Sequence, residues 1–390
     1  RWDLDARGYS RTWRDHRVPI LPVLILPPLL LSIFPSFAVG GAQSRFTTLA
    51  NHLGSDWSHT IIAMDGVTAA RERLDSNVTA TFPVVENRKG DLTGNLRRFR
   101  SLIRTLAPAT LLTHNFGSIE WALASRFTSV RHVHVEDGFG PEERSKQLQR
   151  RVWLRRLALR NRPTILPSQT LLEIASATWR LNPAFLHYIP NGIDLTRFST
   201  QGQPFEWPPE KSRNGPIVGT VAALRPEKNI GRLIHAFHVV TAQTPARLLI
   251  VGDGPQRTEL IQLAEDLALS DRIHFAGHVP KPDTLITSMD IFAMSSDTEQ
   301  MPISLLEAMA AGCPVASTDV GDIAQMLPAA GRAFVTPCDH NALGQALLRL
   351  VRSHELRKTL GQACQLRAME KFDQSQMFAK WSSMLKTGQT

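Results

Sequence analysis

Two glutamates at a fixed spacing are the residues of this chain best suited to ligand chemistry. Glu299 and Glu307 are separated by seven residues, and the apolar run 291–294 before them reads as a buried strand. Pro302 stands where a helix over residues 304–311 is expected to begin. A carboxylate before a helix N-terminus, with free amide groups beside it, suits a polyhydroxylated ligand that carries phosphate. The alternative interpretation is two acidic residues on a solvated helix face.

The elements that would position these glutamates follow a repeated pattern of short apolar runs and longer helical segments. The runs do not alternate with polar residues, which is typical of parallel strands covered on both faces. The expected strands span residues 29–34, 59–64, 111–114, 132–135, 164–167, 217–222, 247–251, 273–276, 291–294, 315–318 and 333–335. Strand–helix–strand connections in both halves predict an α/β fold of two Rossmann-like, doubly wound domains facing a cleft.

Composition and charge narrow the classes of function. The chain has 390 residues, 43% of them hydrophobic and 20% charged, which excludes a disordered protein and predicts two or three domains. Residues 1–200 carry a net charge of +10 and residues 201–390 a net charge of −1, so the first half is expected to face an anionic partner. The basic residues accompany no nucleic-acid-binding module, which argues against nucleic acid. The three cysteines lack metal-ligand spacing and fit a reducing cytoplasm.

Two segments raise the question of membrane contact. Residues 18–34 are apolar apart from Ser32, but four prolines interrupt them, so a proline-rich lead-in before one buried strand is favoured over an anchor or a signal sequence. Residues 144–162 contain eight Lys and Arg interleaved with Trp and Leu. This helix either lies on an anionic membrane or is an ordinary amphipathic helix with a solvated arginine face. The early Asp3-Leu4-Asp5 follows no strand, so no metal site is expected there.

Further motifs follow the predicted strands in a fixed order. They are Gly40-Gly41-Ala42-Gln43, Ile189-Pro190-Asn191-Gly192-Ile193-Asp194, Leu224-Arg225-Pro226-Glu227-Lys228-Asn229, Val251-Gly252-Asp253-Gly254-Pro255 and Phe275-Ala276-Gly277-His278-Val279. Together with residues 295–321, this set resembles the family 4 retaining glycosyltransferases, from residue 29 to the C-terminus. The resemblance implies the GT-B fold and transfer of a sugar from a nucleotide diphosphate donor. It also implies retention of the anomeric configuration, with no metal and no cofactor.

The resemblance assigns roles in donor binding residue by residue. Glu307 would hold the ribose hydroxyls of the donor. Glu299, with the amides of Gln300 and Met301, would contact the transferred sugar. Lys228 would neutralise the diphosphate. Glu299, Lys228 and Arg225 are also expected to be catalytic residues. A hydrogen bond to a charged acceptor is worth about 1.5–3 kcal/mol, which is enough to position a nucleotide sugar.

Glycine loops and a second cation complete the predicted donor site. Gly41, after the first strand, would let the backbone approach the diphosphate, as phosphate-cradling loops do. Val279 would lie where the family's nucleobase contacts the backbone, and Gly252 is also expected to bind the donor. Many relatives have arginine where this chain has Ala223, so we expect Arg225 to supply that positive charge. The alternative is that Arg225 is a solvent-facing loop residue.

The acceptor side departs from the family pattern. Relatives often carry a histidine just after a strand of the first domain, where this chain reads His132-Val133-His134-Val135-Glu136-Asp137-Gly138. Depending on alignment, that position is His134, Glu136 or Asp137. We expect Glu136 and Asp137 to be catalytic residues of the cleft that orient the acceptor or the sugar. The alternatives are a turn-forming aspartate before glycine and, for His134, a satisfied core histidine.

These inferences give a domain plan and a function. The plan is a lead-in (1–28), an acceptor-side domain (29–198), a linker (199–214), a nucleotide-sugar-binding domain (215–371) and, as in relatives, a helix crossing back to the first domain (372–390). The expected activity is hexosyl transfer from a nucleotide sugar to a glycan or lipid-linked acceptor in bacterial surface polysaccharide or glycolipid synthesis. The protein would be cytoplasmic or peripheral on the inner membrane face. A sugar-nucleotide epimerase of the same fold and a non-catalytic membrane-associated scaffold stay open as alternatives.

Overall fold

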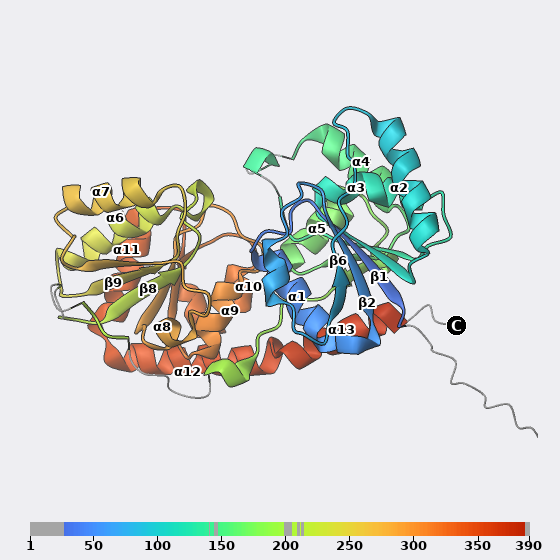
Figure 1. The fold of residues 1–390 in the computed structure, drawn as a ribbon. Coiled ribbons are helices and arrows are strands. Elements are labelled where there is room, and N and C mark those ends of the chain that lie inside the picture. The colour runs from blue at the N-terminus through green and yellow to red at the C-terminus, as the bar shows by residue number, and fades with distance from the viewer. Residues whose placement is uncertain are drawn as a thin grey trace, which may run out of the picture.

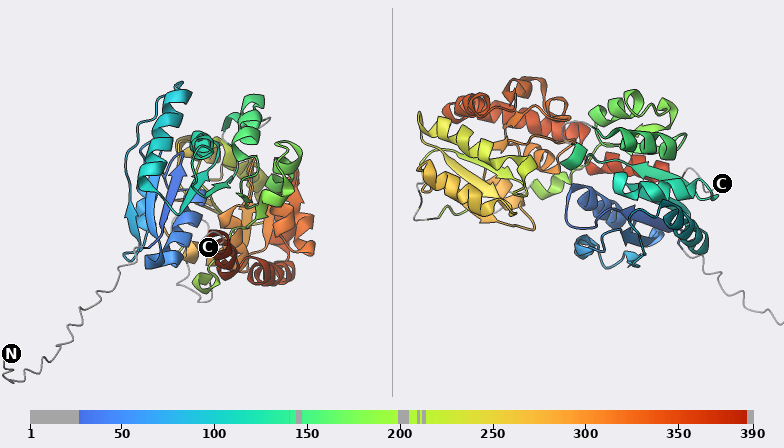
Figure 2. Two further views of the ribbon diagram at one scale, coloured as in Figure 1. Left: turned by 90° about the vertical axis from the view of Figure 1, so that its right-hand side faces the viewer. Right: turned by 90° about the horizontal axis from the view of Figure 1, so that it is seen from above.

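The chain forms two α/β domains placed side by side (Figures 1 and 2). The computed structural model describes residues 27–139, 141–143, 147–198, 205–208, 211 and 214–386. Most of the expected lead-in, including Asp3-Leu4-Asp5, lies outside these residues, as do most of the expected linker and residues 144–146 of the basic segment. Each domain has a parallel sheet flanked by helices, so the predicted fold class is confirmed.

The first domain is built on a seven-stranded parallel sheet in the order β3-β2-β1-β4-β5-β6-β7. Its strands are β1 (Leu29–Phe34), β2 (Ser58–Ala63), β3 (Thr79–Thr81), β4 (Thr110–His114), β5 (His132–Val135), β6 (Thr164–Leu166) and β7 (Leu186–Tyr188). Its helices are α1 (Gly41–Leu53), α2 (Leu92–Leu106), α3 (Ile119–Ser125), α4 (Gln149–Leu159) and α5 (Gln169–Ala177). The strand order reverses between β1 and β4, so the loops after these strands meet at one switch point.

The second domain repeats this plan with the order β10-β9-β8-β11-β12-β13. Its strands are β8 (Ile217–Val221), β9 (Arg247–Val251), β10 (Ile273–Gly277), β11 (Ile291–Met294), β12 (Val315–Thr318) and β13 (Val335–Thr336). Its helices are α6 (Ile230–Thr241), α7 (Arg257–Asp266), α8 (Asp283–Thr287), α9 (Ile303–Ala310), α10 (Ile323–Met326), α11 (His340–Arg352) and α12 (His354–Lys371). The switch point here lies between β8 and β11, whose following loops carry Lys228 and Glu299.

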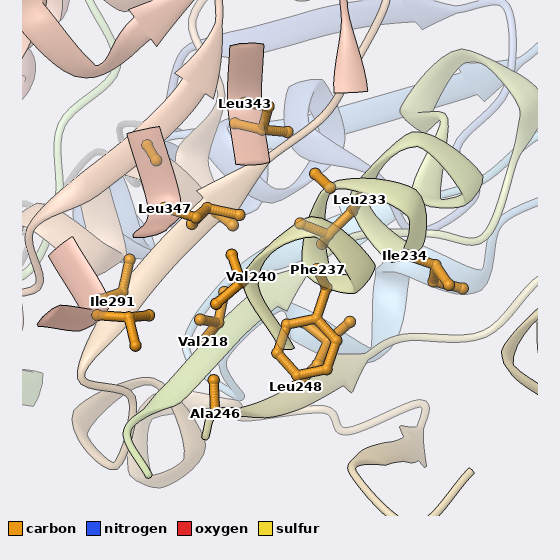
Figure 3. Close-up of a cluster of buried hydrophobic side chains, with 14 of the residues drawn as sticks. Val218, Leu233, Ile234, Phe237, Val240, Ala246, Leu248, Ile291, Leu343 and Leu347 are labelled. Carbon is orange, nitrogen blue, oxygen red and sulfur yellow. The ribbon is translucent and has the colours of Figure 1, made fainter. Parts of the chain in front are cut away.

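Apolar side chains cover both faces of the second sheet, which explains why its strands do not alternate with polar residues. On one face, Val218 and Leu248 of the strands meet Phe237 of α6 and Leu347 of α11, and all four are fully buried (Figure 3). On the other face α9 packs its leucines against β11. Burying such a side chain contributes about 1.5–3 kcal/mol. Burial on both faces therefore stabilises the sheet that holds the loops at its carboxyl edge in place.

Two strands of the first sheet were not predicted from the sequence. They are β3 and β7, three residues each, and both lie at the edges of the sheet. Their side chains are partly or largely exposed, so the segments lack the apolar run that marks the central strands. Short, polar edge strands are a common protection against edge-to-edge aggregation.

The end of the chain crosses from the second domain to the first. Helix α12 runs along the second domain, and α13 (Gln374–Lys386) continues under the first (Figure 1). Met377, Trp381 and Leu385 of α13 are buried in the core of the first domain. At the junction, the Ile193 amide donates to the Phe372 carbonyl at 2.7 Å. The two domains are thus joined by two chain passages, which limits how they can move.

Residues 149–159 of the basic segment form helix α4, whose two faces differ in burial. Val152, Arg155 and Ala158 face inward, whereas Trp153 is 66% and Leu157 47% exposed. Among the described residues, no helix is both long enough and apolar enough to cross a membrane.

Candidate functional site

The loops after β8 and β11 bring two predicted site residues of opposite charge into contact. The Lys228 ammonium lies 2.5 Å from the Glu299 carboxylate, and the Ser296 hydroxyl donates to the same oxygen at 2.8 Å. The Ser295 hydroxyl ties the loops further by donating to the Lys228 carbonyl at 3.0 Å. The side chain of Glu299 is 9% exposed and that of Lys228 is 26% exposed. Lys228 is therefore the partner that an incoming anion can reach more easily.

Glu307, the second predicted glutamate, lies on α9 and is nearly buried, with 9% of its surface exposed. Arg197 reaches it at 3.3 Å and also pairs with Asp283, its Nε lying 3.1 Å from that carboxylate. Burial raises the pKa of Glu307, and the Arg197 guanidinium opposes that rise. The Arg197 guanidinium therefore favours the ionised form of this carboxylate.

The predicted second cation and the predicted glycine loop lie at the surface. Arg225 is exposed, and within the described residues its side chain makes no hydrogen bond or ion pair. Gly41 begins α1, and a Cβ atom there would stand 3.9 Å from Ile303, the first residue of α9. The amino ends of α1 and α9, one from each domain, therefore face each other. Such ends carry unpaired amides and the positive end of the helix dipole.

Gly252 and Val279 both have structural roles that explain their identity without a ligand. Gly252 has a φ of 139°, and a Cβ atom there would lie 1.9 Å from the Ala222 carbonyl oxygen. Glycine is therefore required by the close approach of two backbones. Val279 is half-buried against the apolar face that contains α9.

The acidic pair after β5 is divided between two environments, and the first is a buried network. Glu136 is fully buried and accepts a hydrogen bond from Arg155 at 3.1 Å, while Arg155 also forks onto Glu143. The Nε2 atom of His134 lies 3.3 Å from the Glu136 carboxylate. The other ring nitrogen of His134, Nδ1, is hydrogen-bonded to the Thr113 hydroxyl at 2.8 Å. Burial alone would raise the pKa of Glu136, but Arg155 and His134 bring it below its ordinary value. Glu136 and His134 thus lie inside the first domain, which favours the core-histidine alternative for His134 and separates Glu136 from the domain junction.

Asp137 points instead to the junction of the domains. Its carboxylate pairs with Arg45 of α1 at 2.6 Å, and Arg45 donates to the Asn191 side chain at 3.2 Å. Asn191 in turn donates to the Met301 carbonyl of the second domain at 2.8 Å. Burial raises the pKa of Asp137, and Arg45 opposes the rise. A polar chain thus runs from Asp137 to the loop that follows Glu299.

A cleft of about 300 Å³ lies between the domains beside this loop. Its lining comes from both domains: Phe139, Glu143, Gln147, Thr170, Asp297, Thr298, Glu299, Gln300, Val320 and Gly321. Gln300 bridges the two sides because it accepts a hydrogen bond from the Ser168 hydroxyl at 3.1 Å. A larger cavity of about 770 Å³ lies between α6, α7 and α11 and contains none of the predicted site residues. The interdomain cleft is therefore the candidate site.

Comparison with known proteins agrees with this geometry. The family model described as Glycosyltransferase Family 4 matches residues 39–197, and the model described as Glycosyl transferases group 1 matches residues 204–367. The chain is 31% identical over 273 residues to the GDP-mannose-dependent monoacylated alpha-(1-6)-phosphatidylinositol monomannoside mannosyltransferase of Corynebacterium glutamicum, covering 66% of this chain and 68% of that enzyme. The chain belongs to the family 4 glycosyltransferases.

Two further similarities extend this result. The chain is 25% identical over 174 residues to the N-acetyl-alpha-D-glucosaminyl L-malate synthase of Bacillus anthracis, covering 44% of this glycosyltransferase but only 46% of that enzyme. Its fold matches the Anabaena protein HepE, solved in complex with UDP and glucose, with a TM-score of 0.77 and 19% identity over 92% of this chain and 100% of that one. The second similarity establishes the GT-B architecture.

Three polar residues of this glycosyltransferase were missed by motif reading. Arg45 lies four residues after Gly41, hence on the same face of α1, and that spacing was a usable signal. Arg197 follows the motif at 189–194 by three residues, and extending the motif would have included it. Asp322 lies directly after Gly321 at the domain junction, and nothing in the local sequence marks it.

Proposed function

We propose that this protein is a retaining glycosyltransferase that moves a hexose-type sugar from a nucleotide diphosphate sugar to an acceptor hydroxyl. The acceptor would be a glycan or a lipid-linked precursor in bacterial surface polysaccharide or glycolipid synthesis. The observation that carries the proposal is the Lys228–Glu299 pair at the switch point of the second sheet, beside a cleft lined by both domains. Open α/β sheets bind their ligands at such switch points.

In this proposal the bound donor replaces one partner in the ion pairs of the candidate site. The diphosphate would draw Lys228 away from Glu299, with Arg225 and the amino ends of α1 and α9 adding positive potential. Glu299 would then be free to accept hydroxyls of the transferred sugar. The ribose hydroxyls would donate to Glu307, whose ionised form Arg197 favours. These protein groups would neutralise the leaving diphosphate without a metal or a cofactor.

The acceptor side of the proposal rests on Asp137. It is the acidic residue after β5 that lies at the domain junction, whereas Glu136 is held inside the first domain by Arg155. Asp137 would orient the acceptor or the sugar, and Glu136 would fix the backbone that presents it. Of these two acidic residues, only Asp137 is proposed to contact the acceptor or the sugar directly.

A binding screen tests the proposed donor site. Thermal unfolding is measured with nucleotide sugars that differ in base and hexose, and a cognate donor at 100 times its dissociation constant should stabilise the protein by about 2.7 kcal/mol. Glu307→Gln should abolish this stabilisation, whereas Asp339→Asn, an exposed helix cap of the second domain, should retain it. If no nucleotide sugar stabilises the wild type, the proposal is wrong. If a donor is isomerised without transfer, the protein is an epimerase.

Helix α4 supports a second element of the proposal, peripheral contact with an anionic membrane surface at the inner membrane face. Trp153 and Leu157 are exposed on the same side of the helix as the exposed Arg150 and Arg160. Apolar and cationic side chains together suit an anionic lipid interface. Co-sedimentation with phosphatidylglycerol vesicles should exceed that with phosphatidylcholine vesicles and fall in Trp153→Ala. The matched control is Phe127→Ala, 58% exposed on another segment, and equal losses in both variants would contradict this contact.

A further inference from the structure

The amino end of α5, in the first domain, is capped by an aspartate of the second domain. One Asp322 carboxylate oxygen accepts a hydrogen bond from the Gln169 amide at 2.6 Å. The other accepts from the Thr170 amide at 3.0 Å and from the Thr170 hydroxyl at 2.7 Å. Asp322 is only 2% exposed. A carboxylate at a helix amino end satisfies free amides and meets the positive end of the helix dipole, so this contact is chemically specific.

The same residue holds the loop that follows Glu299. The Asp322 amide donates to the Gln300 carbonyl at 3.0 Å. The preceding Gly321 packs so closely that a Cβ atom there would lie 2.3 Å from the Glu299 carbonyl oxygen. Asp322 is therefore rigidly joined to the donor loop through its backbone and to the first domain through its side chain.

The cap of α5 makes a second connection to this loop. Ser168 is the residue that caps α5 from within its own domain, accepting from the Leu171 amide at 3.0 Å. Its hydroxyl also donates to the Gln300 side chain at 3.1 Å. Gln300 and Asp322, both of the second domain, thus contact the amino end of α5 in the first domain.

We propose that Asp322 is a positioning residue that latches the donor loop onto α5, so that closing the domains and aligning Glu299 and Gln300 are a single event. This inference rests on the proposed function, because it deepens the role of the same loop. When the domains separate, the carboxylate and the α5 amides return to water, so the contact forms and breaks without leaving a buried charge unpaired. A closed cleft excludes water, which directs the sugar to the acceptor instead of to hydrolysis.

The first test needs no substrate. Spin labels at Ser101→Cys on α2 and Lys358→Cys on α12, both exposed, report the distance between the domains in a Cys338→Ser background. Asp322→Asn should broaden the distance distribution and lengthen its mean. The matched control is Asp339→Asn, which weakens the cap of α11 within one domain and should leave the distribution unchanged. An unchanged distribution in Asp322→Asn overturns the latch whether or not the protein transfers sugar.

A second, milder variant separates loss of the contact from a folding defect in Asp322→Asn. Thr170→Val removes one of the three hydrogen bonds to Asp322 and should broaden the distribution less than Asp322→Asn. Because both changes act on one contact, the double variant should resemble Asp322→Asn alone. Additive broadening would mean that the two residues act separately, which contradicts the latch.

The second test uses a donor identified by the binding screen. Asp322→Asn should raise the ratio of hydrolysed to transferred sugar severalfold and lower kcat more than it raises the donor KM. A role confined to general stability would lower both products together and leave their ratio unchanged, and that result overturns the positioning role. If the wild type transfers no sugar while the distance test succeeds, the proposed function fails and the latch stands.

Discussion

Three carboxylates that are proposed to bind the donor or the acceptor are each paired with a cationic side chain in this structure. Lys228 pairs with Glu299, Arg197 with Glu307 and Arg45 with Asp137. Each pair places a carboxylate beside a cation that compensates its negative charge. A ligand that brings its own charge can replace one partner without leaving the other buried alone. The pairing therefore suits a site that alternates between empty and occupied.

Removing Arg197 should change the pH dependence of donor binding. Burial raises the pKa of Glu307 and Arg197 opposes the rise, so Arg197→Gln raises that pKa further. Because the ribose hydroxyls need an ionised acceptor, donor affinity is present above this pKa and is lost as the pH falls through it. The acid limb of the donor binding profile, measured by calorimetry, should move to higher pH.

The control for this prediction is Arg225→Gln. Arg225 is an exposed residue of the loop after β8 and pairs with no carboxylate in the described structure. Its loss should weaken donor binding without moving the acid limb. Superimposable profiles for wild type and Arg197→Gln would show that Glu307 does not bind the donor in its ionised form.

At the residue scale, the sequence indicated which residues belong to the candidate site better than it indicated which side chains they pair with. The motifs pointed to Lys228 and Glu299, which the structure brings together after β8 and β11, and to Glu307, which lies on the helix that follows. The sequence could not show that Glu136 is buried, because Arg155, nineteen residues later, neutralises it only in the folded chain. Partners far apart in sequence depend on packing, which local patterns do not record.

Among the elements, the central strands were predictable and the edges were not. Strands such as β1 and β11 have the bounds that were expected from their apolar runs. The edge strands β3 and β7 have no such run because one side of each meets solvent. The helix after Glu299 was expected over residues 304–311 and is found as α9, one residue earlier at each end. Element boundaries set by capping and proline chemistry are therefore readable, whereas pairing at a sheet edge is not.

Gly252 tests how tightly two of these elements approach. Gly252→Ala would place a Cβ atom 1.9 Å from the Ala222 carbonyl at a φ of 139°, so the loops after β8 and β9 must separate. The variant should lose about 1–3 kcal/mol or more in the free energy of unfolding, measured by urea denaturation. Gly277→Ala is the matched control, since its φ is also positive at 71° but nothing lies within 4 Å of the added atom. Equal losses in both variants would show that backbone conformation, not the close approach, requires Gly252.

On the scale of the whole molecule, the chain passes twice between the two domains, and polar contacts connect them across the cleft. Helix α13 is anchored in the first domain, while Asp322 and Asn191 connect the domains at the cleft. The fold class followed from strand and helix patterns alone. The contacts across the cleft did not, because they depend on how two independently folded sheets are oriented.

Trp381 measures how much α13 stabilises the first domain. Its side chain is 2% exposed within that domain's core, so Trp381→Ala should cost about 3–5 kcal/mol. Trp153→Ala, at an exposed position, should change the free energy of unfolding by less than about 0.5 kcal/mol. Hydrogen exchange should show loss of protection in β1 and β2, with β8 and β9 unaffected. Loss spread evenly over both domains would mean that α13 does not belong to the first domain's folding unit.

The most direct measurement of the central claim is the fate of the donor. A nucleotide sugar selected by the binding screen is incubated with the protein, and the first-formed sugar product is followed by NMR together with the released nucleotide. The account predicts release of a nucleoside diphosphate, a product that keeps the donor's anomeric configuration, and a rate about 10- to 100-fold lower in Lys228→Ala, as expected for a lost charged hydrogen bond. Inversion of configuration, or a wild-type rate in Lys228→Ala, would contradict it.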